Sequence, residues 1–203
     1  MAIRQRIRTA ITTTTKIWVR EPYALFSHLH NGHALPDFMR VGKSVEQGKL
    51  TGLDSHEVAA LGSSYDLVLI EADGSKGKPL KYPADYEPVI PAFSDRVIVV
   101  AGLDALSGRI EEQVFRHELF EGATGARADT RVTLPLLLRF LEGDAMMKGV
   151  DGDKCVVVLN KYDVCAEKHA VPDIAKAVLQ KSGACHVIVC SVRFEVFYGV
   201  TRV

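Results

Sequence analysis

Two carboxylates and a group of lysines follow directly after an apolar segment near the middle of the chain. Leu67 to Ile70 is a continuous apolar run, which predicts a strand buried on both faces of a parallel sheet. Glu71 and Asp73 come next, and because side chains alternate along a strand their carboxylates lie on the same side. Acids at the carboxyl end of such a strand lie where open α/β sheets bind ligands, and they could hold Mg²⁺ or orient a water.

The lysines of the same segment supply the opposite charge. Gly74 and Gly77 allow the backbone to turn tightly, and Lys76, Lys78 and Lys81 surround the two acids. A glycine and lysine loop of this kind can face phosphate, so the segment predicts half of a nucleotide site with Lys76 as a contact. The alternative is an ordinary strand end with solvated charges, and the local pattern does not decide between the two.

A second set of polar residues follows a later apolar run. Cys155 to Leu159 predicts a buried strand, and Asn160-Lys161-Tyr162-Asp163 comes directly after it. Asn-Lys-x-Asp in this position resembles the guanine-recognition motif of the GTPases. An aspartate can accept hydrogen bonds from N1–H and the 2-amino group of guanine, the lysine stem can lie over the base, and the asparagine can reach N7.

Ser191 is the fourth expected contact to the base. Ser191-Val192-Arg193 comes one helix and one strand after the first loop, where GTPases place a second base-contacting loop. This order favours guanine recognition by Asn160, Lys161, Asp163 and Ser191. The alternative is that Asn160 and Asp163 cap the following helix, which is a common use of both residues.

Strands and helices are predicted to alternate and to position these residues. The predicted strands are Ile7–Ile11, which is followed by a hydroxyl-rich turn, Phe38–Val41, the strand before Glu71, Arg96–Ala101, Lys154–Leu159 and His186–Cys190. The predicted helices are a short one from Glu21 to Leu29, one from Asp54 or Ser55 to Leu61, Val132–Leu141 and Pro172–Ser182. An amphipathic stretch that ends at Phe120 lies between the strand at Arg96–Ala101 and the helix at Val132–Leu141. The pattern predicts a single α/β domain over residues 1–203, with a mostly parallel sheet covered by helices on both faces.

Gly42-Lys43-Ser44 matches only the end of a phosphate-binding loop. The first glycine of such a loop would have to stand at position 37, which is Asp37, and no helix pattern follows. We therefore do not expect a phosphate-binding loop at this position.

Composition and charge limit the classes of protein to which the chain could belong. Lys plus Arg and Asp plus Glu each number 25, so no net charge would recruit nucleic acid or an anionic membrane. No apolar run reaches transmembrane length, and none follows the arginines near Met1, so we expect neither a membrane span nor a signal peptide. The four cysteines have no CxxC spacing and predict reduced thiols in a cytoplasmic protein. Cys165 and His169 could form half a metal site, but no second pair accompanies them.

Several segments together resemble the YqeC family, proposed accessory proteins of selenium-dependent molybdenum hydroxylases. The segments that carry the resemblance are Thr12-Thr13-Thr14-Thr15-Lys16-Ile17-Trp18, Lys49-Leu50-Thr51-Gly52-Leu53, the acid, glycine and lysine segment from Glu71 to Lys81, Glu87-Pro88-Val89-Ile90-Pro91, Gly102-Leu103-Asp104-Ala105-Leu106 and Asn160-Lys161-Tyr162-Asp163. The family is similar to P-loop NTPases of the metallochaperone type. The resemblance therefore implies a P-loop NTPase-like fold and the function of a nucleotide-linked maturation factor. It also implies GTP or another NTP with Mg²⁺ as cofactors, and a molybdenum hydroxylase or its cofactor-handling proteins as partners.

The resemblance also implies roles for individual residues. Asp73 would be the acid on the Mg²⁺ side, and Glu71 would support it or orient a water. The hydroxyls of Thr13 and Thr14 would lie near the metal and the γ-phosphate.

One part of the expected fold differs in this sequence. Family members begin with a strand, a Gly-Gly-Lys-Thr phosphate loop and a helix before the threonine run, whereas here the run begins at Thr12. We therefore expect that the first βα unit is missing, that triphosphate affinity is weak, and that hydrolysis is slow or absent. A truncated gene, a late start assignment and a degenerate protein fit equally well.

A non-catalytic protein-interaction scaffold is the alternative function. In that case the α/β scaffold docks a partner and the nucleotide residues are inherited relics. A missing strand would leave an exposed sheet edge, which would favour a homo-oligomer.

Overall fold

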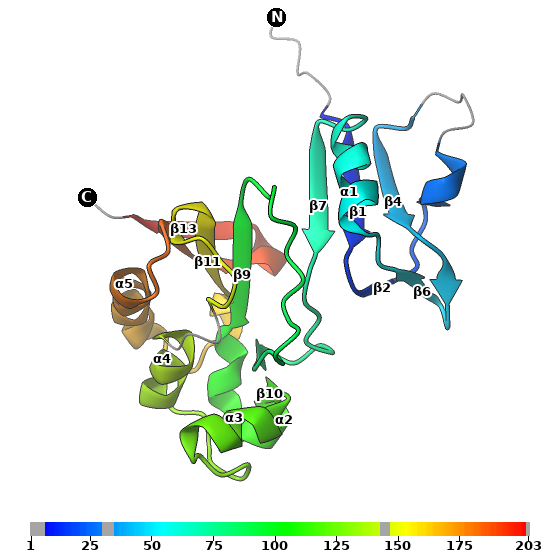
Figure 1. Ribbon diagram of the computed structural model, residues 1–203. Helices are drawn as coiled ribbons and strands as arrows, with labels where there is room; N and C mark the ends of the chain where they lie inside the picture. Colours follow the sequence, from blue (N-terminus) through cyan, green and yellow to red (C-terminus); the bar gives the residue numbers. More distant parts are fainter. Residues whose placement is uncertain (1–6, 30–34, 143–146, 202–203) are drawn as a thin grey trace, which may run out of the picture. The chain divides into compact units, whose positions relative to one another are not determined.

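The computed structural model describes residues 7–29, 35–142 and 147–201. The chain divides into two compact units, the first formed by Met1–Gly74 with Val89–Pro91 and the second by Ser75–Pro88 with Ala92–Val203. Each unit has its own four-stranded sheet with helices packed on it, so an α/β fold with parallel sheets is confirmed (Figure 1). The single domain expected for residues 1–203 stays a prediction.

The main sheet of the first unit is parallel throughout. In sheet order its strands are β3 (Tyr23–Leu25), β4 (Phe38–Gly42), β1 (Thr9–Thr13) and β7 (Leu67–Glu71). A smaller antiparallel sheet contains β2 (Lys16–Trp18), β6 (Lys49–Thr51) and β5 (Val45–Glu46). The register of β1 and β7 places Thr13 opposite Glu71, so a hydroxyl and a carboxylate meet at the end of the sheet.

Helix α1 (Ser55–Gly62) covers one face of this sheet. Asp54 begins the helix with a capping box: its side chain accepts from the Glu57 N–H, and the Glu57 side chain accepts from the Asp54 N–H. Val58 and Leu61 of the helix are buried in a core with residues of β1 and β4. The predicted helix and its Asp54 cap are therefore confirmed.

The sheet of the second unit is parallel except for one edge strand. In sheet order its strands are β13 (Val196–Thr201), β12 (His186–Ser191), β11 (Cys155–Asn160) and β9 (Val97–Gly102). The antiparallel strand is β13, which the sequence patterns do not predict. A separate two-stranded pair joins β8 (Leu80–Lys81) to β10 (Val114–Phe115).

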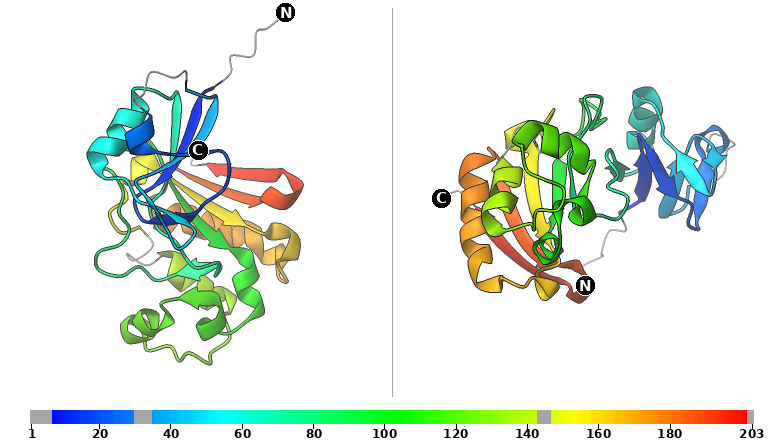
Figure 2. Two further views of the ribbon diagram at one scale, coloured as in Figure 1. Left: turned by 90° about the vertical axis from the view of Figure 1, so that its right-hand side faces the viewer. Right: turned by 90° about the horizontal axis from the view of Figure 1, so that it is seen from below.

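The helices of the second unit enclose its core on one side of the sheet. They are α2 (Ile110–Gln113), α3 (His117–Thr124), α4 (Leu134–Glu142) and α5 (Val171–Lys181). The same unit contains the short 3₁₀ turns η2 (Leu103–Ser107), η3 (Gly152–Lys154), η4 (Tyr162–Val164), η5 (Lys168–Ala170) and η6 (Val192–Phe194). Helix α5, in orange, runs beside the sheet in both views of Figure 2. Val157 and Leu159 of β11 are buried in the same core as Ile174 and Val178 of α5.

Helices pack on one face of each sheet, which differs from the predicted cover on both faces. Leu67 and Leu69 of β7 are 43% exposed, and Ile98 and Val100 of β9 are 60% exposed. The prediction that the Leu67–Ile70 run is buried on both faces is therefore wrong, and the exposure of Ile98 and Val100 likewise contradicts helices on both faces of the second sheet. An apolar run predicts that a segment forms a strand of a sheet, but it does not show whether helices cover one face of that sheet or both.

One predicted helix and one amphipathic stretch each contain a strand. The segment from Glu21 to Leu29 forms β3 and the 3₁₀ turn η1 (Phe26–His28), because β3 pairs with β4. The amphipathic stretch that ends at Phe120 is interrupted by β10, which pairs with β8. In both places, pairing with a segment distant in the sequence outweighs the local pattern.

Candidate functional site

Threonine hydroxyls and one carboxylate cluster in the first unit, where β1 and β7 end. The hydroxyl of Thr13, which is fully buried, donates to the Glu71 carbonyl oxygen at 2.8 Å and lies 3.2 Å from Glu71 Oε2. Thr15 Oγ1 lies 3.1 Å from Thr13 Oγ1 and 3.4 Å from Glu71 Oε2. The structure thus brings Thr13 and Glu71 together, as the sequence predicts for two members of one site.

Thr14 is engaged with a different segment. Its hydroxyl donates to the Val89 carbonyl oxygen at 2.7 Å, and its N–H donates to the Glu71 carbonyl oxygen at 3.1 Å. The backbone of Gly52 passes so close that a Cβ there would lie 2.6 Å from the Thr14 carbonyl carbon. Only glycine permits this approach, so Gly52 fixes the path of the threonine run.

Burial raises the pKa of the Glu71 carboxyl above its ordinary value, because desolvation disfavours the charged form. The hydroxyls of Thr13 and Thr15 act in the opposite direction, and the charge of Asp73 raises the pKa further. A carboxyl of this kind can accept and release a proton closer to neutral pH than an exposed glutamate.

The polar side chains around Glu71 fit the expected Mg²⁺ only in part. In the described part of the chain, no group of three or more His, Cys, Asp and Glu residues could hold a metal ion. Mg²⁺ bound together with phosphates needs only one or two carboxylates, which Asp73 and Glu71 could supply. The hydroxyls of Thr13 and Thr14, by contrast, already donate to oxygens of Glu71 and Val89. Their role as metal ligands stays a prediction.

A second polar cluster lies in the second unit, where β11 and β12 end. The Asn160 side-chain oxygen accepts from the Val192 N–H at 3.2 Å and lies 3.5 Å from Cys190 Sγ. The hydroxyl of Ser191, which is 3% exposed, donates to Asp163 Oδ1 at 2.6 Å. The two loops that the sequence assigns to base recognition are therefore joined by side-chain hydrogen bonds.

Neither Asn160 nor Asp163 caps a following helix. The residue at the N-terminus of η4 is Lys161, and no side chain caps that turn. The residues at the corresponding positions of η5 and α5, Glu167 and Ala170, make no side-chain cap either. The capping alternative for Asn160 and Asp163 is therefore wrong.

Lys161 forms an ion pair that the sequence does not predict. Its Nζ lies 2.6 Å from Asp104 Oδ2, and its backbone has φ of 64°, in the left-handed region that favours glycine. The other oxygen of Asp104 is buried and has no hydrogen-bond partner in the described structure. Such strain and an unsatisfied acceptor are features that gather at functional sites. The sequence does contain one sign that Asp104 could belong to a site: it is an acid just after the end of β9, as Asp73 is just after the end of β7.

The lysine loop borders the same edge of the sheet as the Asn160 loop. The Gly102 N–H donates to the Pro79 carbonyl oxygen at 2.9 Å, which holds the loop against the end of β9. Gly102 lies opposite Asn160 in the register of β9 and β11. Lys76 itself is exposed and has φ of 52°. Within the second unit, Asn160, Lys161, Asp163 and Ser191 thus lie at one end of the sheet with Pro79 of the lysine loop beside it, whereas Lys76 Nζ lies 5.1 Å from the centroid of the Phe115 ring.

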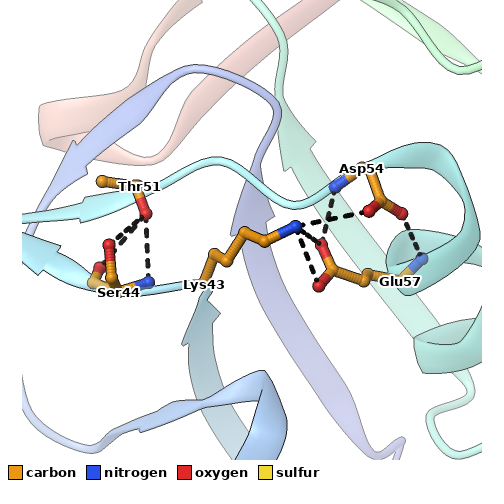
Figure 3. A network of polar contacts seen from close by, with 5 residues as sticks. All are labelled: Lys43, Ser44, Thr51, Asp54 and Glu57. Atoms are coloured by element: carbon orange, nitrogen blue, oxygen red, sulfur yellow. Dashed lines mark hydrogen bonds and ion pairs between the residues drawn. The ribbon is translucent and has the colours of Figure 1, made fainter.

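The Gly42-Lys43-Ser44 segment does not form a phosphate-binding loop. Strand β5 rather than a helix follows it, and Lys43 Nζ lies 3.4 Å from Asp54 Oδ2 and 3.3 Å from Glu57 Oε1 (Figure 3). Ser44 bonds to Thr51 in the same view. Lys43 therefore pairs with the helix cap, and the rejection of a phosphate loop here is confirmed.

The Cys165 and His169 pair acquires no further metal ligand. Cys165 is a buried free thiol whose pKa is raised by burial. Neither residue belongs to a possible metal-binding group in the described ranges. We assign no site to this pair.

Comparison with known proteins gives a family. The family model described as YqeC protein matches residues 2–118, which include Thr13, Glu71 and Lys76 and end before Asn160. A curated relative from Escherichia coli (strain K12), described as uncharacterized protein YqeC, is 34% identical over 140 residues, covering 66% of this chain and 54% of the relative. The chain therefore spans about half the length of that relative. No solved structure matches the chain. Among the residues described, none of the helices is both long and apolar enough to cross a membrane.

Proposed function

Because the chain belongs to the YqeC family, we propose that it is a nucleotide-linked accessory or maturation factor for a selenium-dependent molybdenum hydroxylase, with GTP as the favoured nucleotide. The observation that carries the nucleotide assignment is the pair of hydrogen bonds joining Asn160 and Asp163 to the loop after β12. The α/β units would then derive from a P-loop NTPase-like fold. The four free cysteines fit a reducing compartment, so we place the function in the cytoplasm.

The bonds that each side chain already makes determine what it could offer a base. Asn160 uses its oxygen on Val192, which leaves its amide N–H groups to donate to N7 of guanine. Ser191 holds one oxygen of Asp163, and the carboxylate keeps further lone pairs for N1–H and the 2-amino group. The ion pair with Asp104 fixes the ammonium end of the Lys161 side chain, and its aliphatic stem could lie over the base.

The remaining expected residues would act on phosphate and metal. Lys76, an exposed cation of the second unit, would contribute a positive charge to the phosphates. In the first unit, Asp73 would serve as an Mg²⁺-side acid and Glu71 as its partner or as a group that orients water. When bound, Mg²⁺ would neutralise phosphate charge.

Binding of a fluorescent GTP analogue tests the nucleotide assignment. We expect competition by GTP but not by ATP, and loss of binding in Asp163→Ala, because adenine lacks the N1–H and 2-amino donors. Asp95→Ala, which changes an exposed aspartate of the same unit, should bind as wild type does. Equal competition by ATP would refute guanine recognition, and equal loss in Asp95→Ala would refute the role of Asp163.

The exposed apolar face of the second unit's sheet favours a second candidate function, a non-catalytic interaction scaffold. Ile98, Val100 and Phe197 are each 60% exposed, and an apolar face of this kind often marks an interaction site. A purified molybdenum hydroxylase that binds the chain while no nucleotide binding is detectable would select this function. Val100→Asp should then weaken that binding.

A further inference from the structure

The turn after β9 holds a carboxylate in place beside the loop after β11. Asp104 is the second residue of η2, and its neighbours Leu103 and Ala105 are 1% and 0% exposed. The carbonyl oxygen of Asp104 accepts from the Ser107 hydroxyl at 2.6 Å, which closes the turn. Because buried residues anchor the backbone on both sides, the Asp104 side chain begins from a fixed point.

The packing around Gly102 sets the direction of that carboxylate. Gly102 is the last residue of β9 and lies opposite Asn160 in the register of β9 and β11. A Cβ at this position would collide with Asp104 Oδ1, and it would lie 2.7 Å from Pro79 Cβ. Glycine therefore lets the carboxylate pack against the end of β9, next to the strand end that carries Asn160.

The two oxygens of the Asp104 carboxylate have unequal surroundings. Oδ1 is buried and has no hydrogen-bond partner among the described residues, whereas Oδ2 lies 2.6 Å from Lys161 Nζ. An acceptor that is buried without a donor destabilises a fold, so the stability of the turn alone does not account for this placement. What the placement gains is the ion pair with Lys161.

Lys161 is the residue that this ion pair restrains. Its side chain is 44% exposed, so without a partner the ammonium could adopt many positions in solvent. Holding a lysine side chain in one position removes conformational entropy, and that entropy would otherwise be lost when a ligand binds. Asp104 thus supplies the restraint before any ligand arrives.

We propose that Asp104 is a positioning residue for the nucleotide base, which acts by holding the Lys161 ammonium so that the aliphatic stem is already in place. This inference rests on the proposed nucleotide-binding function. A side chain that is ordered in advance increases affinity, because less entropy is lost on binding. The stem would contact guanine and adenine alike, so Asp104 raises affinity without choosing between the two bases, a choice that belongs to Asp163.

Binding of the fluorescent GTP analogue to wild type, Asp104→Asn, Lys161→Met and the double variant tests this role. We expect each variant to bind about fivefold more weakly than wild type, because all three lack the same partly exposed ion pair. Lys161→Met keeps an aliphatic stem and loses only the ammonium, so its loss should equal that of Asp104→Asn. GTP should still compete in Asp104→Asn while ATP does not. Asp95→Asn, at an exposed aspartate of the same unit, should bind as wild type does.

The double variant separates positioning from a purely structural role. If the double variant loses more affinity than either single variant, Asp104 acts independently of Lys161 and the proposal is wrong. A larger loss in Lys161→Met than in Asp104→Asn, or tighter binding by Asp104→Asn, would also overturn it, because the Lys161 ammonium would then contact the ligand directly.

Acetylation of Lys161 by an amine-reactive reagent, read by mass spectrometry, tests the restraint without a ligand. In Asp104→Asn no carboxylate holds the amine, so we expect Lys161 to react about fivefold faster than in wild type. Lys176, an exposed lysine of α5, should react equally in both proteins. Equal rates at Lys161 would overturn the positioning role whatever the nucleotide result. A faster reaction at Lys161 in the variant, with no analogue binding by wild type, would instead refute the nucleotide function and the role that depends on it.

Discussion

Replacing Ser191 by alanine tests whether the loops after β11 and β12 stabilise one another. The Ser191 hydroxyl is buried and donates to Asp163 Oδ1 at 2.6 Å, so the substitution removes a short bond to a charged acceptor. Hydrogen bonds to charged groups contribute about 1.5–3 kcal/mol net. We therefore expect Ser191→Ala to lower the free energy of unfolding by about 2 kcal/mol.

A double-mutant cycle isolates that bond from other effects of the substitution. Ser191→Ala, Asp163→Ala and the double variant are unfolded in urea and followed by circular dichroism, and we expect a coupling energy of about 1–2 kcal/mol. Asp153→Ala, an exposed aspartate of the same unit, serves as the control partner and should give additive effects. A coupling energy below about 0.5 kcal/mol for Ser191 and Asp163 would refute the reasoning, because residues that do not interact add within that margin.

Three further predictions concern the folded units. Burial raises the pKa of Glu71 above its ordinary value of 4.5. Between these two values the folded state binds more protons than the unfolded chain, so the free energy of unfolding falls as the pH rises through that window. Glu71→Gln should remove this fall in urea unfolding followed by fluorescence of the single tryptophan, and an unchanged pH slope would contradict the assignment. Phe120→Ala should lower the free energy of unfolding by about 3–5 kcal/mol, because Phe120 is only 2% exposed. Leu119→Ala should lower it far less, because Leu119 is 43% exposed. Similar losses in the two variants would disprove the packing argument. In Gly52→Ala a Cβ would lie 2.6 Å from a backbone atom of the threonine run, whereas in Gly62→Ala no atom lies within 4 Å of the new Cβ. We therefore expect a lower melting temperature for Gly52→Ala than for Gly62→Ala. Equal melting temperatures would show that the threonine run can move aside.

Local signals in the sequence were sufficient to predict much of the second unit. The strands before Asn160 and Ser191 and the helix between them follow from apolar runs and apolar periodicity, which depend on neighbouring residues alone. Parallel strands end at the same edge, so the meeting of the Asn160 and Ser191 loops could be predicted from the order of the elements.

Features that depend on distant pairing could not be predicted. The exposure of Leu69 and Val100 depends on how many layers cover each sheet, and the apolar runs carry no information on that number. The contacts of Lys76, Lys81 and Arg116 with the Phe115 ring depend on the pairing of β8 with β10, which interrupts an otherwise amphipathic stretch. The ion pair between Lys161 and Asp104 likewise joins residues far apart in the sequence.

The contact between Cys190 and Asn160 gives the loop after β11 a chemical reporter. Cys190 is fully buried, and burial raises the pKa of its thiol, so a thiol reagent reaches a reactive thiolate there only after local opening. The labelling rate of Cys190, read by mass spectrometry of the peptide that contains it, therefore measures how often the loop opens. A ligand that bridges the two loops would slow that rate without any label having been engineered into the chain.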